Sequence, residues 1–108
     1  MFSPDPEKLV YWANIEFTYE PGSKHHGEFE GGYVYVFVQA MDARDAMDQF
    51  QLEFASLKLG IRFVEFVSLY AEVPWHSEED QEHYDAIATL ASSTEEVIFD
   101  SFEVYERR

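Results

Sequence analysis

Apolar and polar side chains alternate over residues 9–19, and a period of two is typical of a half-buried β-strand. Its two faces would carry Tyr11, Ala13, Ile15, Phe17 and Tyr19 on one side, and Trp12, Asn14, Glu16 and Thr18 on the other. A second strand is predicted over residues 33–40, apolar on both faces: Val34, Val36 and Val38 against Tyr33, Tyr35 and Phe37. The polar loop 21–32 contains turn residues, so the two strands form a long-looped hairpin.

Two later segments have apolar residues at the spacing of an α-helix. The first begins at Asp42, which is placed to cap free N–H groups, and is expected to end at Gly60 in a left-handed conformation. The second begins near Ser77, with Asp80 as its capping-box-like partner, and ends before residues 92–94. The two apolar stripes are Ala43, Ala46, Met47, Phe50, Phe54 and Leu57, and Tyr84, Ile87, Ala88 and Ala91, with Leu90 beside the latter.

Further strands are predicted over residues 61–73 and 97–106, which makes the order β-β-α-β-α-β in one domain, residues 1–108. Residues 33–73 form a β-α-β unit, so the sheet should combine parallel and antiparallel strands. We therefore predict an α+β two-layer sandwich, in which two helices cover one face of a four-stranded mixed sheet.

This arrangement leaves the second sheet face open. That face would carry large aromatic rings beside polar groups: Trp12, Tyr33, Tyr35 and Phe37. An exposed face of this kind is a candidate contact surface. The alternative is that a dimer partner, the loop or the chain termini cover it.

Charge adds a second feature to this picture. The 108 residues contain 22 Asp and Glu against 7 Lys and Arg, a net charge of −15, which repels nucleic acid and anionic lipid and attracts basic surfaces. The densest acidic window lies at the start of the second predicted helix: Glu78, Glu79, Asp80, Glu82 and Asp85. These acids either steer a basic partner or simply keep the protein soluble.

Other compositional features exclude several classes of protein. The sequence has no cysteine, so disulfides and thiolate chemistry are ruled out. We expect a cytoplasmic protein without membrane association, because the first ten residues do not resemble a signal peptide and the apolar runs are too short to span a bilayer. Phosphate-binding glycine motifs are missing, and we expect no cofactor.

Two groups of histidines are candidate metal ligands. His25 and His26 are adjacent in the loop, where we interpret them as solvated side chains. His76, Asp80 and His83 have helical spacing and form the weaker alternative of a metal-dependent enzyme. Residues 76–80 lack the HExxH signature, so a solvated first helical turn is the preferred interpretation.

Glu65 interrupts an apolar strand and is a candidate general base if it is buried. The preferred interpretation is that it points out of the second sheet face, as Glu16 does, with Val64 and Phe66 in the core. Arg62 is then expected to form a local cross-strand ion pair.

One stretch has a family resemblance. The run F-E-G-G-Y-V-Y-V-F-V-Q-A-M-D, residues 29–42, precedes a helix and then G-I-R-F-V-E-F-V, residues 60–67. This arrangement resembles small acidic bacterial proteins, and its overall character is similar to immunity proteins that neutralise bacterial toxins. The resemblance implies a protein-binding role and assigns no site residue.

Three hypotheses follow. The first is a non-enzymatic interaction protein that occludes a basic partner, with Trp12, Tyr33, Tyr35 and Phe37 as anchors and the acids of residues 78–85 for steering. The second is a small regulatory or ligand-binding domain that homodimerises through its sheet face. The third is the metal-dependent enzyme.

Overall fold

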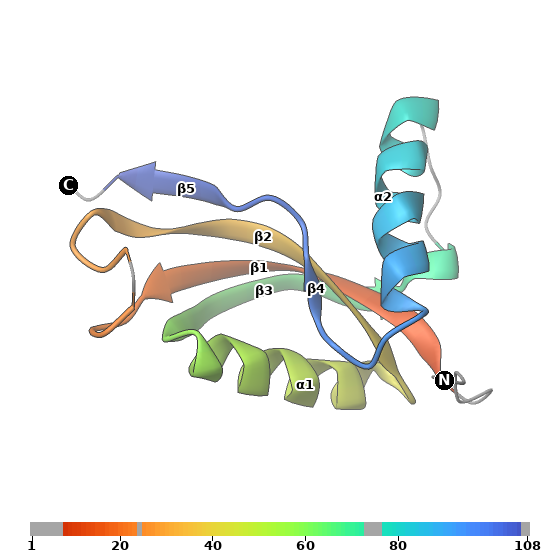
Figure 1. Cartoon of the computed structure of the whole chain (residues 1–108), viewed down its shortest axis with the longest axis horizontal. Helices are drawn as coiled ribbons and strands as arrows, with labels where there is room; N and C mark the ends of the chain where they lie inside the picture. Colours follow the sequence, from red (N-terminus) through yellow and green to blue (C-terminus); the bar gives the residue numbers. More distant parts are fainter. Residues whose placement is uncertain (1–7, 24, 73–76, 107–108) are drawn as a thin grey trace.

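The computed structural model of the chain describes residues 8–23, 25–72 and 77–106. The chain is a compact α+β domain, as the sequence predicts, built from an antiparallel sheet and two α-helices (Figure 1). Its elements in chain order are β1 (Leu9–Tyr19), β2 (Phe29–Ala40), α1 (Ala43–Ser56), β3 (Leu59–Leu69), the 3-10 helix η1 (Tyr70–Glu72), α2 (Glu78–Ala91), β4 (Ile98–Phe99) and β5 (Glu103–Glu106).

The strands lie in the order β3-β1-β2-β4, and β5 also pairs with β2. Every pairing among these strands is antiparallel, so the expected mixture of parallel and antiparallel neighbours is not present in them. The reason is that β1 lies between the two strands of the β-α-β unit. β2 and β3 both run antiparallel to β1 and therefore point the same way without touching, while α1 connects them across β1.

The main core lies between α1 and the sheet face that carries the odd residues of β1 and the valines of β2. Ala46, Phe50 and Phe54 of α1 are fully buried against this face and Met47 packs beside them, which confirms the centre of the predicted stripe. Its two end members, Ala43 and Leu57, are exposed. Burying a phenylalanine side chain stabilises a fold by roughly 1.5–3 kcal/mol. The predicted cap is also confirmed, because the Asp42 carboxylate accepts a hydrogen bond of 2.8 Å from the backbone N–H of Asp45.

Several boundaries differ from the prediction. α1 ends at Ser56, and the left-handed residue after it is Lys58, with φ 59°, rather than Gly60, which lies in β3. β2 begins at Phe29 and includes Gly32, where an added Cβ would lie 2.2 Å from the carbonyl oxygen of Glu103 on β5. Gly32 therefore does not form a turn. It allows the backbones of β2 and β5 to approach closely, because a side chain at this position would clash with β5.

The last two predicted strands are also shorter than expected. β3 ends at Leu69, where η1 takes over, and residue 73 lies outside the described residues. The segment 97–106 splits into β4 and β5, because residues 100–102 between them are not in a strand, although the Asp100 N–H still donates to the Tyr35 carbonyl at 2.9 Å.

Two irregularities in β3 decide which way its side chains point. The register with β1 shifts twice, and Arg62 and Glu65 are the residues left without a Cα partner. An extra residue reverses the alternation of faces that follows it. Val64 accordingly packs against the α1 core, whereas Phe66 joins the cluster on the other face.

The two helices lie on opposite faces of the sheet, and the prediction that both cover one face is wrong. α1 and the sheet form the expected two layers, whereas Ala88 and Ala91 of α2 pack on the other face, with Trp12 and Phe37. Figure 1 shows α2 standing against one end of the sheet, away from α1. The physical reason is that both faces of β1 and β2 carry large apolar groups, and each needs cover.

A buried glutamine holds α2 in this place. Gln39 of β2 is 4% exposed, and its Nε2 donates to the carbonyl oxygens of Ala91, Ser92 and Thr94 at 3.3, 2.9 and 2.9 Å. Ala91 is the last residue of α2 and Ser92 its C-cap, and carbonyls at a helix end have no partner within the helix itself. Thr94 lies in the segment that follows. The sheet therefore caps the C-terminal end of α2 directly.

Candidate functional site

The aromatic face predicted to be open is largely covered. Trp12 is 7% exposed and Phe37 is 0% exposed, so neither ring is available as a surface anchor. The ring of Trp12 lies 5.3 Å from that of Tyr35, 5.7 Å from that of Phe37 and 5.5 Å from that of Tyr84 on α2. These three contacts place Trp12 at the centre of the second core, because α2 supplies the missing layer.

Tyr33 is the member of the predicted anchor set that remains exposed, at 41% of its surface. It lies beyond the part of the face that α2 covers, 6.0 Å from the ring of Tyr105. The Tyr105 hydroxyl donates to Glu16 over 2.9 Å, and Arg62 lies 3.7 Å from the same carboxylate. Glu16 thus lies on the second sheet face as expected, and Arg62 forms the expected cross-strand ion pair, with Glu16 as the partner that the sequence did not specify.

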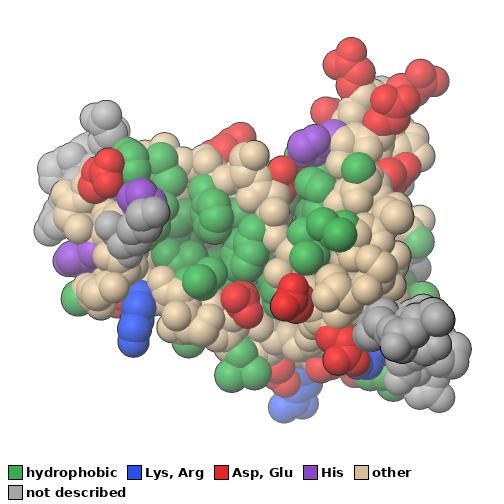
Figure 2. Space-filling model, in the orientation of Figure 1, with side chains coloured by type: hydrophobic (Ala, Val, Ile, Leu, Met, Phe, Trp, Pro, Cys, Tyr) green, Lys and Arg blue, Asp and Glu red, His purple; other side chains and the backbone are tan. Residues whose placement is uncertain are grey.

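The five predicted steering acids all lie on α2 and are exposed. Figure 2 shows acidic side chains gathered at the end of α2 that projects beyond the sheet. Ser77 caps this end by accepting from the N–H of Asp80 over 3.3 Å, and acids in a first helical turn also interact favourably with the helix dipole. Asp85 differs from the others, because it accepts a hydrogen bond from the hydroxyl of Tyr70.

A small pocket of about 220 Å³ lies where α2, β2 and the β4–β5 connection meet. We call it the tyrosine–acid pocket. Its walls contain three tyrosine rings, two carboxylates and a histidine: Tyr33, Tyr35, Tyr84, Asp100, Glu103 and His83. Two of the predicted anchors therefore do reach a surface site, but as walls of a pocket and not as part of a flat sheet face.

The electrostatics of the pocket are negative. Burial raises the pKa of Tyr84, and Tyr35 and the acids Asp100, Asp80 and Glu103 raise it further, so this hydroxyl stays protonated. His83 Nε2 lies 3.1 Å from Asp100 Oδ2, and the side chain of Asp100 is only 13% exposed. A positive group at this site would meet carboxylates on the side of the β4–β5 connection and aromatic faces on the side of the sheet.

The metal hypothesis gains no support from the described residues. Within residues 8–23, 25–72 and 77–106, no group of three or more His, Asp or Glu is arranged to hold a metal ion. His76 lies outside the described residues, Asp80 is exposed, and His83 turns to Asp100. In the loop, His25 Nδ1 contacts Glu28 at 3.1 Å while His26 Nδ1 contacts the Tyr19 carbonyl at 2.9 Å.

Glu65 is exposed, as the preferred interpretation of the sequence expects, and is therefore no candidate for a buried general base.

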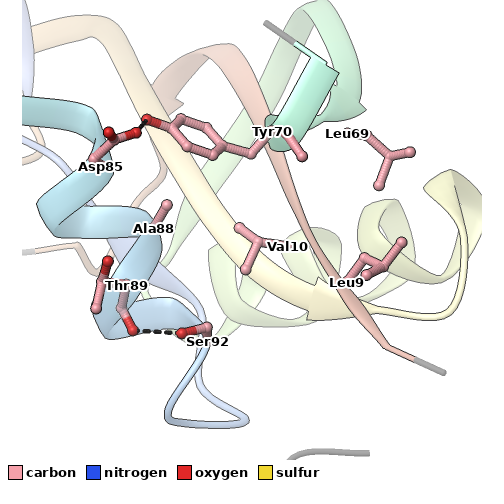
Figure 3. Close-up of a pocket in the computed structure, with 9 residues that line it drawn as sticks. Leu9, Val10, Leu69, Tyr70, Asp85, Ala88, Thr89 and Ser92 are labelled. Carbon is pink, nitrogen blue, oxygen red and sulfur yellow. Dashed lines mark hydrogen bonds between the residues drawn. The ribbon is translucent and has the colours of Figure 1, made fainter. Parts of the chain in front are cut away.

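A larger hollow of about 580 Å³ lies at the other side of α2, against the ends of β1 and β3 (Figure 3). Three of its polar side chains, Tyr70, Asp85 and Ser92, form hydrogen bonds within the wall. The Tyr70 hydroxyl donates to Asp85, and the Ser92 hydroxyl donates to the Thr89 carbonyl oxygen over 2.7 Å. The first bond fastens α2 to η1, which follows β3, and the second closes the last turn of α2. We therefore assign this hollow a structural role.

Sequence reasoning named His83 only as a metal candidate and Tyr84 only as part of a helical stripe, and it missed three other walls of the tyrosine–acid pocket: Asp100, Ser101 and Glu103. Asp100 left one signal, since it interrupts the apolar run of residues 97–102. Nothing in the sequence indicates that these residues line one site, because contacting residues such as His83 and Asp100 are 17 positions apart in the chain.

Comparisons of the chain with protein-family models, curated proteins and solved structures found no match. Neither helix of the described part of the chain has the length and apolar character needed to cross a membrane.

Proposed function

We propose that the chain is a non-enzymatic interaction module that binds a basic protein partner and blocks it by occlusion, as an immunity or inhibitor protein does. The tyrosine–acid pocket carries this proposal, because it combines ring faces with carboxylates next to the acidic side of α2. Lysine and arginine side chains bind carboxylates and stack on aromatic faces.

The size of the pocket favours a side chain over a free small molecule. Small-molecule sites enclose roughly 300–1,000 Å³, whereas this pocket has about 220 Å³. One arginine or lysine from a partner surface fits that scale, and the acids of α2 would meet the surrounding basic surface. Long-range attraction by the net charge of −15 would speed the encounter.

The direct test is a titration of ¹⁵N-labelled protein with the peptide acetyl-Gly-Arg-Gly-amide. The control peptide contains citrulline, which has nearly the same shape as arginine without the charge. We expect the arginine peptide to shift the amide signals of Tyr33, His83 and Ser101, and salt to weaken the effect. Equal shifts with both peptides, or shifts confined to other parts of the chain, would refute the proposal.

Two variants that remove one charge each sharpen this test. Glu103→Gln changes a pocket wall, and Glu65→Gln changes an exposed acid on β3 outside the pocket. We expect several-fold weaker binding of the arginine peptide to the first variant and an unchanged affinity for the second. If both variants lose affinity equally, net charge alone is responsible and the pocket is not the site.

At the level of the partner, a basic protein captured from the source cell at low salt should be released by the arginine peptide. The citrulline peptide should release none of it. If neither peptide releases the captured protein, the partner contacts another part of the surface, and this result would count against the pocket.

Homodimerisation through the sheet is the less favoured hypothesis. α2 occupies much of the face that such a dimer would use. The exposed edge strand β3 contains two register shifts and the charged residues Arg62 and Glu65, and such features oppose strand-to-strand pairing. Light scattering of the purified chain would revive the hypothesis if it gave twice the mass of 12.7 kDa.

A further inference from the structure

The Asp100 carboxylate in the wall of the tyrosine–acid pocket already has a partner within the chain. Its side chain is 13% exposed, and its backbone N–H donates to the Tyr35 carbonyl at 2.9 Å, which fixes the residue beside β2. The Nε2 atom of His83 on α2 lies 3.1 Å from Oδ2 and 3.2 Å from Oδ1 of this carboxylate. A single ring nitrogen therefore faces both oxygens.

A ligand cation needs the same position. An arginine guanidinium binds a carboxylate most strongly through two parallel N–H···O bonds, one to each oxygen. Because His83 Nε2 is within hydrogen-bond distance of both oxygens of Asp100, it occupies the place between them. A guanidinium can form this pair of bonds with Asp100 only after the imidazole has moved away.

The His83 side chain can leave Asp100 without disturbing the fold. It is 55% exposed, and its ring meets the Tyr84 ring edge-on at a centroid distance of 4.9 Å. α2 is held by other bonds, since Gln39 binds the carbonyls at its end and Tyr70 donates to Asp85. Exposed side chains change rotamer within nanoseconds, so the exchange of imidazole for guanidinium needs no movement of the helix.

The titratable groups around His83 belong to three parts of the fold. They are Asp100 and Glu103 from the segment of β4 and β5, Tyr33 and Tyr35 from β2, and Glu79, Asp80, Glu82 and Tyr84 from α2 itself. The walls of the pocket include no Lys or Arg. Carboxylates ordinarily change charge near pH 4 and phenols near pH 10, whereas histidine does so between about pH 5 and pH 8. His83 is therefore the wall whose charge responds to mild acid.

We propose that His83 competes with the partner's cation for Asp100 and that a proton on its ring controls this competition. The proposal rests on the function proposed above and adds its regulation. An imidazolium forms a charge-assisted hydrogen bond with a carboxylate, which is stronger than the bond from a neutral imidazole, and it also repels a guanidinium. The partner is thus bound near neutral pH and released in mild acid.

The test is the affinity of acetyl-Gly-Arg-Gly-amide at about pH 8 and about pH 5.5, at one ionic strength. The peptide has no group that titrates in this range, because its ends are blocked and arginine stays charged. We expect binding to be roughly fivefold weaker at the lower pH, the difference between a charge-assisted and an ordinary hydrogen bond. Equal affinities, or tighter binding in acid, would overturn the proposal.

Two variants assign the pH dependence to a residue. Glutamine in His83→Gln can still donate to Asp100 but stays uncharged, so this variant should bind equally well at both pH values. The matched control is His25→Gln, because His25 also lies 3.1 Å from a carboxylate, that of Glu28, but outside the pocket. It should keep the roughly fivefold ratio. If His83→Gln keeps the ratio or His25→Gln removes it, other groups respond to the acid and the proposal is wrong.

Proton release is a second measurement, which a purely steric role of His83 would not affect. Binding and protonation are linked reciprocally, so a peptide that prefers the neutral imidazole should release protons on binding. Calorimetric titration at about pH 6.5, in two buffers with different enthalpies of ionisation, measures this release. We expect it for the unchanged chain and for His25→Gln, and not for His83→Gln. Proton uptake, or release that persists in His83→Gln, would contradict the proposal.

These outcomes separate the role of His83 from the proposed function. If the arginine peptide binds no better than the citrulline peptide at about pH 8, where the imidazole is ordinarily neutral, the proposed function fails and the role of His83 with it. If the arginine peptide binds specifically at this pH and acid does not weaken it, only the role of His83 is refuted.

Discussion

Replacing Trp12 with alanine tests whether α2 covers the sheet as the structure has it. Trp12 lies beneath the helix and contacts rings from β2, β3 and α2, including Phe66 at 5.0 Å and Tyr84 at 5.5 Å. Its indole N–H donates to the Ser68 hydroxyl over 3.2 Å. If the face were open instead, the same substitution would only remove a surface ring.

The expected loss of stability can be worked out from this burial. A tryptophan buries roughly 150–250 Å², which at about 25 cal/mol per Å² corresponds to about 4–6 kcal/mol as an upper estimate. Measured Trp-to-Ala changes in cores cost about 3–5 kcal/mol, including the cavity that remains. A domain of this size is stable by about 5–15 kcal/mol, so the variant should lose a large share of its stability.

The assay is urea unfolding followed by far-UV circular dichroism, which does not depend on tryptophan fluorescence. Phe63→Ala is the matched control, because Phe63 is an aromatic residue that is 57% exposed on β3. We expect the control to change the free energy of unfolding by less than about 0.5 kcal/mol. A Trp12→Ala variant as stable as this control would refute the placement of α2 and the second core with it.

Two further variants test how α2 is held. Gln39→Met keeps the length of the side chain but removes the donor to the carbonyls at the end of α2, and urea unfolding should show a loss of about 1–3 kcal/mol; a loss below about 0.5 kcal/mol would contradict the capping role. Burial and the hydrogen bond to Asp85 raise the pKa of Tyr70 above its ordinary value of 10.0, so the folded state keeps this proton where the unfolded state releases it. The contribution of Tyr70 is therefore complete below about pH 10 and falls as pH rises further. Tyr70→Phe should lose less stability between about pH 8 and pH 11 than the unchanged chain; parallel curves of unfolding free energy against pH would contradict this.

Local patterns predicted the elements of this fold well. The alternation of residues 9–19 coincides with β1, and the stripe of Phe50 and Phe54 lies in the core as expected. Asp42 and Ser77 cap the helices as their positions predict. These features depend on neighbours within one turn or one strand, so the sequence alone contains the information needed.

The candidate sites were predicted less well, because they depend on contacts between distant parts of the chain. Tyr33 and Tyr35 were singled out for their rings, but their surroundings come from α2 and the β4–β5 connection. Nothing about Ser23 in the sequence distinguishes it from other loop serines, and only the folded chain shows that its hydroxyl is buried without a hydrogen-bond partner among the described residues.

The sequence by itself determined that there are two helices, one long hairpin and a strongly acidic surface. Only the tertiary structure decided that α2 lies on the side of the sheet opposite to α1. A period of two sorts side chains into two faces, and a helical stripe shows that a helix needs a partner. Neither pattern says which face meets which helix, because that choice depends on packing both apolar faces at once.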